Sequence, residues 1–383
     1  MFRLALIALA SVLGAQAAQA PVPSSAVGIF EGHSDVGDVR RPSSAEYNPN
    51  TETYVVSGSG ENMWAATDAF QFVWKQVSAE DLSLGADIAI LGASTEGHRK
   101  AVLMIRQSLD ADSAYVDAAL HGEGLTSLQF RDHKGAITRE VESNVSGPAR
   151  LRIEKLGANF YLWIGGKDQP LEFAGGSARV PMQAPFYVGI GVCAHQKDVV
   201  EKAEFTNLEL KTTVPHTHVR YSTVETAILS GDARSGFVSP QHLTSPGWSA
   251  DGHALTYELN GNVEQTPFTP LRTAVPVGAP VAQVQGEGNQ AAADAQPEPV
   301  KSDDFNNLPP HLSPDGRYLL FLSYAKDMTS LPENSEVSLR LMTVANKSVK
   351  TLATFTGGPG SLGAHPWSPD GRRIVFISYQ TME

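Results

Sequence analysis

The stretch HPWSPDGRRIVFISYQ, residues His365–Gln380, decides the fold of the second half of the chain. Its centre recurs twice, as PGWSADGHALTYE at Pro246–Glu258 and as LSPDGRYLLFLSY at Leu312–Tyr324. In the copies at Leu312–Tyr324 and His365–Gln380 the strand after the turn is apolar at nearly every position. Strands without polar alternation are typical of strands buried on both faces, as between the stacked blades of a β-propeller. The repeat therefore predicts propeller blades.

The repeated turn is expected to be structural, and its aspartates are not expected to be catalytic. Proline presets φ at the second turn position, the aspartate accepts hydrogen bonds from nearby amides, and glycine adopts the exit conformation. An active-site aspartate seldom occurs three times with the same turn and the same following strand. The predicted turn residues are Trp248, Asp251, Gly252, Pro314, Asp315, Gly316, Trp367, Pro369, Asp370 and Gly371.

These W-S-x-D-G units and the strands after them resemble the TolB-type, WD-like β-propeller repeats of exported bacterial proteins. The resemblance covers roughly Tyr221–Gln380, without a Pro/Ala/Gln-rich insert at residues 270–300 that is expected to be disordered. It implies a propeller fold and almost nothing about a ligand. Such propellers usually carry about six blades, whereas only three turn units can be recognised here.

The low number of blades leaves three interpretations open. A hairpin at residues 222–238 is expected to supply the outer strands of the last blade, the usual way to close the ring. The insert could hide a degenerate blade, the propeller could be partial, or two chains could pair into a six-bladed ring because each blade needs neighbours to bury its faces.

The first twenty residues, MFRLALIALASVLGAQAAQA, are expected to form a signal peptide that is cleaved after Ala17 or Ala20. Pro21 follows the second site, and a proline just after the cut fits signal peptidases poorly, so cleavage after Ala17 is favoured. No later stretch has the ~20 apolar residues that a spanning helix needs. We therefore expect a periplasmic or secreted protein without a transmembrane segment.

Charge and cysteine content exclude some functions. The net charge of −12 argues against a nucleic acid partner, because that role needs a basic surface. The single cysteine, Cys193, allows no intramolecular disulfide and no CxxC metal site. His216-x-His218 and Asp110-x-Asp112 are weak metal candidates, so neither a metal nor a cofactor is predicted.

The first half of the chain consists of short apolar or alternating runs between Gly, Asp, Ser and Pro, which predicts antiparallel strands. Four segments resemble the concanavalin A-like lectin/glucanase superfamily: Gly58–Val77, Lys100–Gly122, Leu128–Asp132 and Phe186–His195. The expected fold is all-β, with an N-terminal concanavalin A-like (jelly-roll) β-sandwich and a C-terminal partial propeller of about three TolB-like blades. The expected boundaries are residues 24–212 for the sandwich, 213–221 for a connector and 222–383 for the propeller.

Alternation along four predicted strands separates an aliphatic face from a polar and aromatic face. Aromatic rings beside polar groups are what a sugar-binding surface needs, and in this superfamily the sheet face is concave. The alternative is a plain half-solvated sheet face, which is normal in antiparallel sheets. The candidate ligand-binding residues are Asp117, His121, Gln129, Arg131, Tyr161, Trp163, Tyr187 and His195.

The leading hypothesis is an exported, non-enzymatic binding protein that recognises a glycan, an envelope polymer or a partner protein. A carbohydrate hydrolase acting in the sandwich groove is one alternative, although glycosidases typically use two carboxylates and only Asp117 can be placed on the polar face. The E-x-D-x-x-E strand of the superfamily's glucanases is absent. A purely structural interaction module is the other alternative.

Overall fold

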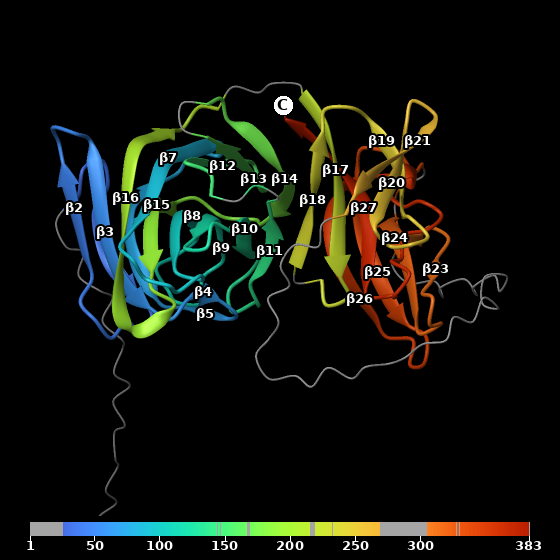
Figure 1. Ribbon diagram of the computed structural model, residues 1–383, viewed down its shortest axis with the longest axis horizontal. Coiled ribbons are helices and arrows are strands. Elements are labelled where there is room, and N and C mark those ends of the chain that lie inside the picture. The colour runs from blue at the N-terminus through green and yellow to red at the C-terminus, as the bar shows by residue number, and fades with distance from the viewer. Residues whose placement is uncertain are drawn as a thin grey trace, which may run out of the picture.

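The structure is a computed structural model that describes residues 26–382, apart from residues 144, 146, 167–168, 215–218, 232, 269–304, 327 and 329. The expected signal peptide, the insert at 270–300 and the two histidines His216 and His218 lie outside the described residues. Apart from one 3₁₀ turn, the regular elements of the described residues are all strands, as expected, and the two parts of the chain lie side by side (Figure 1).

The N-terminal part is a sandwich of two sheets (Figure 1). The first sheet has the order β1 (Gly32–Val36), β6 (Phe70–Val77), β15 (Phe186–Cys193), β8 (Lys100–Arg106), β9 (Tyr115–His121), β10 (Thr126–Arg131) and β11 (Arg139–Glu142). The second sheet has the order β14 (Glu172–Arg179), β13 (Asn159–Gly165), β12 (Arg150–Leu156), β7 (Leu82–Leu91), β16 (Gln196–Lys211), β3 (Thr53–Gly60) and β2 (Ser44–Asn48). A short hairpin of β4 (Met63–Trp64) and β5 (Thr67–Asp68) stands apart from both.

The sandwich core lies between the two sheets and follows the expected alternation. Val116 and Ala118 of β9 and Leu128 of β10 belong to one buried cluster with Ile153 of β12 and Phe160 of β13. Successive side chains of a strand point to opposite faces, so the residues between these turn away from the core. The opposite face of the first sheet is therefore where its polar side chains gather.

The C-terminal part has three blade-like sheets within the described residues (Figure 1). One sheet contains β19 (Leu243–Trp248), β20 (Ala254–Leu259) and β21 (Asn262–Pro267). Another contains β24 (Tyr318–Ala325), β25 (Ser335–Thr343) and β26 (Val349–Gly357), with β22 (Phe305–Asn307) and β23 (His311–Leu312) both paired to β24. A 3₁₀ turn, η2 (Pro359–Ser361), precedes the last strand.

The third blade joins the two ends of the propeller sequence. Strand β17 (Val219–Ile228) pairs antiparallel with β27 (Arg373–Met382), and β18 (Ala233–Ser239) pairs with β17 on its other side. The ring-closing hairpin expected at residues 222–238 is thus present. It begins at Val219, inside the segment expected to be a connector, because the pairing with β27 extends that far.

This third blade is the middle one and is also fused to the sandwich. Ile374 and Phe376 pack toward the β24–β25–β26 sheet, while Val375 and Ile377 pack toward the β19–β20–β21 sheet. Strand β27 is therefore buried on both faces, as its sequence, apolar at nearly every position after the turn, indicated. Strand β18 also pairs in parallel with β11, so a single ten-stranded sheet runs from the sandwich into the propeller (Figure 1).

The three repeated turns share one hydrogen-bond pattern. In each turn the serine hydroxyl donates a hydrogen bond of 2.6 or 2.7 Å to the aspartate, and the amide two residues after the aspartate donates a second. The glycine that follows has φ between +66° and +72°, a conformation that costs glycine little. The serine–aspartate pairs are Ser249–Asp251, Ser313–Asp315 and Ser368–Asp370. This common geometry supports a structural role for the motif.

No helix among the described residues is long and apolar enough to cross a membrane.

Candidate functional site

The eight candidate residues do not share one face, and the expectation that they do is wrong for two of them. Tyr161 and Trp163 lie on β13, which belongs to the second sheet. There they pack with Phe173 and with Tyr221 of β17, at the junction with the propeller. Alternation shows which residues of one strand share a face, but it does not show which sheet the strand joins.

The other candidates belong to the first sheet or its end. Asp117 and His121 lie on β9, and Gln129 and Arg131 lie on β10; all four are nearly or fully buried. Tyr187, on β15, is half-buried with its ring edge-on to Trp74 at 5.1 Å. His195 follows the end of β15 and is half-buried.

Loops cover one end of this face, and Arg131 holds them there. Arg131 forms ion pairs with Asp68 at 2.7 Å and donates hydrogen bonds to the carbonyl oxygens of Ala65, Ser113 and Ala136. Arg106 of β8 reaches the same carboxylate at 3.3 Å and also donates to two loop carbonyls. These three charged side chains are fully buried, so Arg131 is an anchor for loops.

The other end of the face carries a group of polar side chains that we call the polar cluster. Its buried members come from four neighbouring strands, and its rim consists of half-exposed side chains. The buried members are Lys100, Asp117, His121, Ser127, Gln129 and Glu140. The rim residues are Asn62, Trp64, His98, Glu142 and His195.

Strand register explains why these side chains meet. Lys100 lies opposite His121, and Gln129 lies opposite both Asp117 and Glu140. Residues directly opposite one another in antiparallel strands are close enough to interact. Accordingly, Lys100 donates to Gln129 Oε1 at 2.9 Å and to Asn62 Oδ1 at 2.8 Å, and Gln129 donates to Glu140 Oε2 at 3.2 Å.

The Asp117 carboxyl group is the exception in this network. It is fully buried, yet neither oxygen has a hydrogen-bond partner among the described residues. Ser127 Oγ, on the neighbouring strand β10, is also buried without a hydrogen-bond partner among the described residues. Burial raises the pKa of Asp117 well above its usual value, although the Lys100 ammonium opposes this. Buried polar groups nearly always have partners, and an unsatisfied one costs about 1–3 kcal/mol.

A pair of carboxyl groups borders Asp117. Glu140 and Glu142 lie two residues apart on β11 and therefore face the same side. Burial, and next the neighbouring Glu140, raise the pKa of Glu142 to about 8. Glu142 therefore holds a proton at neutral pH, and its hydrogen bond with the Glu140 side chain favours this protonated form.

Histidines complete the rim on the side of β15. The His98 ring centroid lies 5.2 Å from that of His195 and 6.2 Å from that of His121. His121 Nδ1 lies 3.0 Å from the Leu125 carbonyl oxygen, which can only accept, so Nδ1 carries the proton. Burial, followed by Lys100, lowers the pKa of His121 well below its usual value, and burial also lowers the pKa of His195. Both imidazoles are thus neutral near pH 7.

Among the residues the structure describes, no group of three or more His, Cys, Asp or Glu side chains has an arrangement that could hold a metal ion. What the polar cluster offers is a set of hydrogen-bond donors and acceptors around Asp117, beside the ring of Trp64. The Lys100 ammonium lies 5.3 Å from the centre of that ring.

Sequence reasoning missed Lys100, Trp64 and the two glutamates. Lys100 and Arg106 begin and end an apolar strand and have the same parity, and polar residues alternate with other residues in the sequence TREVES (Thr138–Ser143). Those alternations could have placed Lys100, Glu140 and Glu142 on the face of Asp117. Trp64 gives no such signal, because it lies in a two-residue strand within a loop.

No family model matches the chain. Among curated proteins, it is similar to Uncharacterized protein Atu1656 of Agrobacterium fabrum, with 25% identity over 164 residues. The alignment covers 36% of this chain and 55% of that protein, so the chain spans only about half the length of the curated relative it matches.

Solved structures with similar features include a putative TolB from Agrobacterium tumefaciens, at 13% identity and a TM-score of 0.21, covering 79% of this chain and 99% of that one. They also include a seed lectin of Lotus tetragonolobus, at 7% identity and a TM-score of 0.31, covering 48% of this chain and 100% of the lectin. The neighbours therefore include both a TolB-like protein and a lectin.

Proposed function

We propose that the chain is an exported, non-enzymatic binding protein that recognises a glycan at the polar cluster. The observation that supports this most directly is the Asp117 carboxyl group, which is fully buried and has no partner among the described residues. A bound hydroxyl group could donate to one of its oxygens. Such a contact would supply the hydrogen bond that this buried group otherwise lacks.

The surrounding groups fit a hydroxylated ligand. A sugar hydroxyl both donates and accepts, and the cluster supplies the Lys100 ammonium as a donor beside His121 Nε2, which accepts because Nδ1 carries the proton. The half-exposed Trp64 ring offers a flat surface for the apolar side of a pyranose. Of the sequence-based candidates, Asp117, His121, Gln129 and His195 are kept as proposed ligand-binding residues.

A glycan array probed with the full chain tests this proposal, followed by calorimetry on any sugar that binds. The Asp117→Ala variant should weaken binding about tenfold or more. Asp117→Asn should retain most of the affinity, because a neutral amide can still hydrogen bond to the ligand. Glu46→Gln, on the exposed strand β2, and Trp163→Phe, in the second sheet, are controls that should bind like the wild type.

Two results would contradict the proposal. If the folded full chain bound no glycan, a purely structural module would be favoured. If a glycan bound equally well to Asp117→Ala and to the wild type, recognition would lie elsewhere. Melting curves of each variant would show whether a loss of binding reflects a loss of folding.

A hydrolase is a second candidate, favoured by the carboxyl groups that the structure brings to the same face. Glycosidases pair a protonated carboxyl group with an ionised one. Glu142 is protonated at neutral pH, and Glu140 and Asp117 are the other carboxyl groups of the cluster. Release of reducing sugar by the wild type would support this candidate, and Asp117→Asn would then lose turnover while still binding.

The propeller surface is the proposed site for a protein or envelope-polymer partner. The outward side of the end sheet is polar, since Thr256 and Glu258 alternate with the inward Leu255 and Tyr257.

Pairing of two chains into a six-bladed ring is a further proposal. A light-scattering mass of two chains would support pairing, and a mass of one chain would eliminate it.

A further inference from the structure

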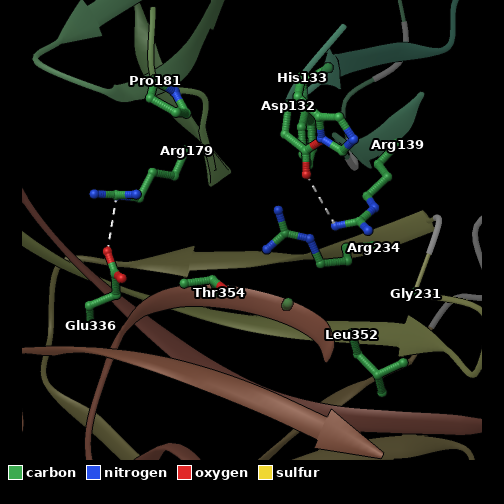
Figure 2. Close-up of a pocket in the computed structure, with 12 residues that line it drawn as sticks. Asp132, His133, Arg139, Arg179, Pro181, Gly231, Arg234, Glu336, Leu352 and Thr354 are labelled. Carbon is green, nitrogen blue, oxygen red and sulfur yellow. Dashed lines mark ion pairs between the residues drawn. The ribbon is translucent and has the colours of Figure 1, made fainter. Parts of the chain in front are cut away.

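A second site lies between the sandwich and the propeller. A crevice of about 420 Å³ is lined by residues of β11 and β14 of the sandwich and of β18, β25 and β26 of the propeller (Figure 2). Its volume falls within the range of about 300–1,000 Å³ typical of small-molecule sites. The crevice is distinct from the polar cluster and shares no residue with it.

Three arginines from three strands line this crevice. Arg139 comes from β11, Arg179 from the end of β14 and Arg234 from β18, and their guanidinium groups project into the space between the two parts (Figure 2). Apolar side chains, including Phe130 and Leu352, form another part of the lining.

The three arginines are held to different degrees. Arg234 is buried and fixed, because it donates to Glu225 at 2.9 Å and to the Ser177 carbonyl oxygen at 2.8 Å. Arg139 lies 3.9 Å from Asp132, too far for a hydrogen bond. Arg179 pairs with Glu336 of the propeller at 3.0 Å, and both side chains are about half exposed. Exposed ion pairs of this kind contribute little, about 0–1 kcal/mol.

We propose that this crevice binds a small organic polyanion, with one carboxylate or phosphate group held by Arg139 and another held by Arg179 on the other side of Arg234 (Figure 2). A guanidinium group presents donors in a planar fork that matches either oxyanion, and such contacts are stronger than neutral hydrogen bonds. The carbon skeleton of the ligand would lie against Phe130 and Leu352. The weak pairs with Asp132 and Glu336 are the contacts that the ligand replaces.

Binding at this place would join the two parts of the molecule. Arg139 and Arg179 belong to the sandwich, whereas Leu352 and Thr354 belong to the propeller. A ligand that contacts both sides only in the folded arrangement stabilises that arrangement by mass action. Its presence should therefore raise the melting temperature of the whole chain.

The test uses the full chain with citrate and pyrophosphate as probes, at constant ionic strength with chloride as the reference anion. We expect at least one probe to raise the melting temperature in a saturable manner and to bind in calorimetry. Binding of citrate alone would identify the ligand group as a carboxylate, and binding of pyrophosphate alone would identify it as a phosphate. Binding of neither at millimolar concentration would overturn the proposal.

Variants locate the effect. The double variant Arg139→Gln and Arg179→Gln should weaken binding about tenfold or more. The matched control is Arg40→Gln and Arg41→Gln, two half-exposed sandwich arginines with similarly loose pairs to Asp198 at 3.8 and 3.9 Å. The control should bind like the wild type. Equal loss in both double variants would show general charge attraction and would overturn the site.

A further variant separates a loss of binding from a loss of folding. Thr354 is exposed on the propeller side of the crevice, so Thr354→Glu adds a carboxylate there without disturbing the core. It should fold like the wild type and bind the same probe more weakly by electrostatic repulsion. Unchanged binding by Thr354→Glu would place the anion outside this crevice.

Discussion

Glu142 of the sandwich pairs with Ser235 of the propeller, at one end of the parallel ladder between β11 and β18. A carboxyl group with a raised pKa therefore lies on the strand that joins the two parts of the molecule. The side chain belongs to the polar cluster, while its backbone belongs to the junction. Its protonation consequently bears on stability as well as on ligand binding.

The contribution of Glu142 to stability should fall as pH rises from about 5 to about 8. The native state holds this proton up to a pKa of about 8, whereas the unfolded chain releases it near 4.5. Between these values the folded state binds more protons, so raising the pH favours unfolding. Glu142→Gln should show a smaller decrease in melting temperature over this range. An identical decrease in variant and wild type would contradict the raised pKa.

Removal of the Asp68 carboxylate should be strongly destabilising. Asp68→Ala leaves the guanidinium groups of Arg106 and Arg131 buried without their shared anion. Breaking a buried pair in this way costs about 3–5 kcal/mol. Denaturant unfolding measures the loss, with Asp198→Ala as the control, since its pairs with Arg40 and Arg41 are exposed and long. A comparably small effect of both variants would mean that the loops do not depend on Asp68.

The turn aspartates should behave alike in all three copies. Asp370→Ala removes an acceptor for the Ser368 hydroxyl and for the Arg372 amide, and should cost about 1 kcal/mol. The equivalent changes at Asp251 and Asp315 should also lower the melting temperature. None of the three should alter glycan or anion binding. A selective loss of binding in one variant would assign that aspartate a functional role.

The propeller was predictable from local patterns, because the turn residues and the largely apolar strand that follows them are adjacent in the sequence. The same holds for the ring-closing hairpin, whose strands β17 and β18 are joined by a short turn. The residues of β9 and β10 that face the core could also be predicted locally, since this requires only the alternation of side chains along a strand.

The candidate site was predictable only in part, because its composition depends on long-range pairing. Nothing in the sequence around Trp163 indicates that β13 belongs to the second sheet. Nor does the sequence around Arg131 indicate that Asp68, 63 residues earlier in the chain, forms an ion pair with it. The parallel pairing of β11 with β18 likewise joins segments about ninety residues apart, for which periodicity gives no signal.

The fused sheet also limits how the molecule can be divided. Strand β18 gains one of its two neighbours from the sandwich, so a fragment containing only the propeller would present a bare row of amide and carbonyl groups along that strand. Bare edges of this kind recruit other strands and promote aggregation. The two halves are therefore best regarded as one cooperative unit, in which strand β11 of the sandwich covers the edge of β18 in the propeller.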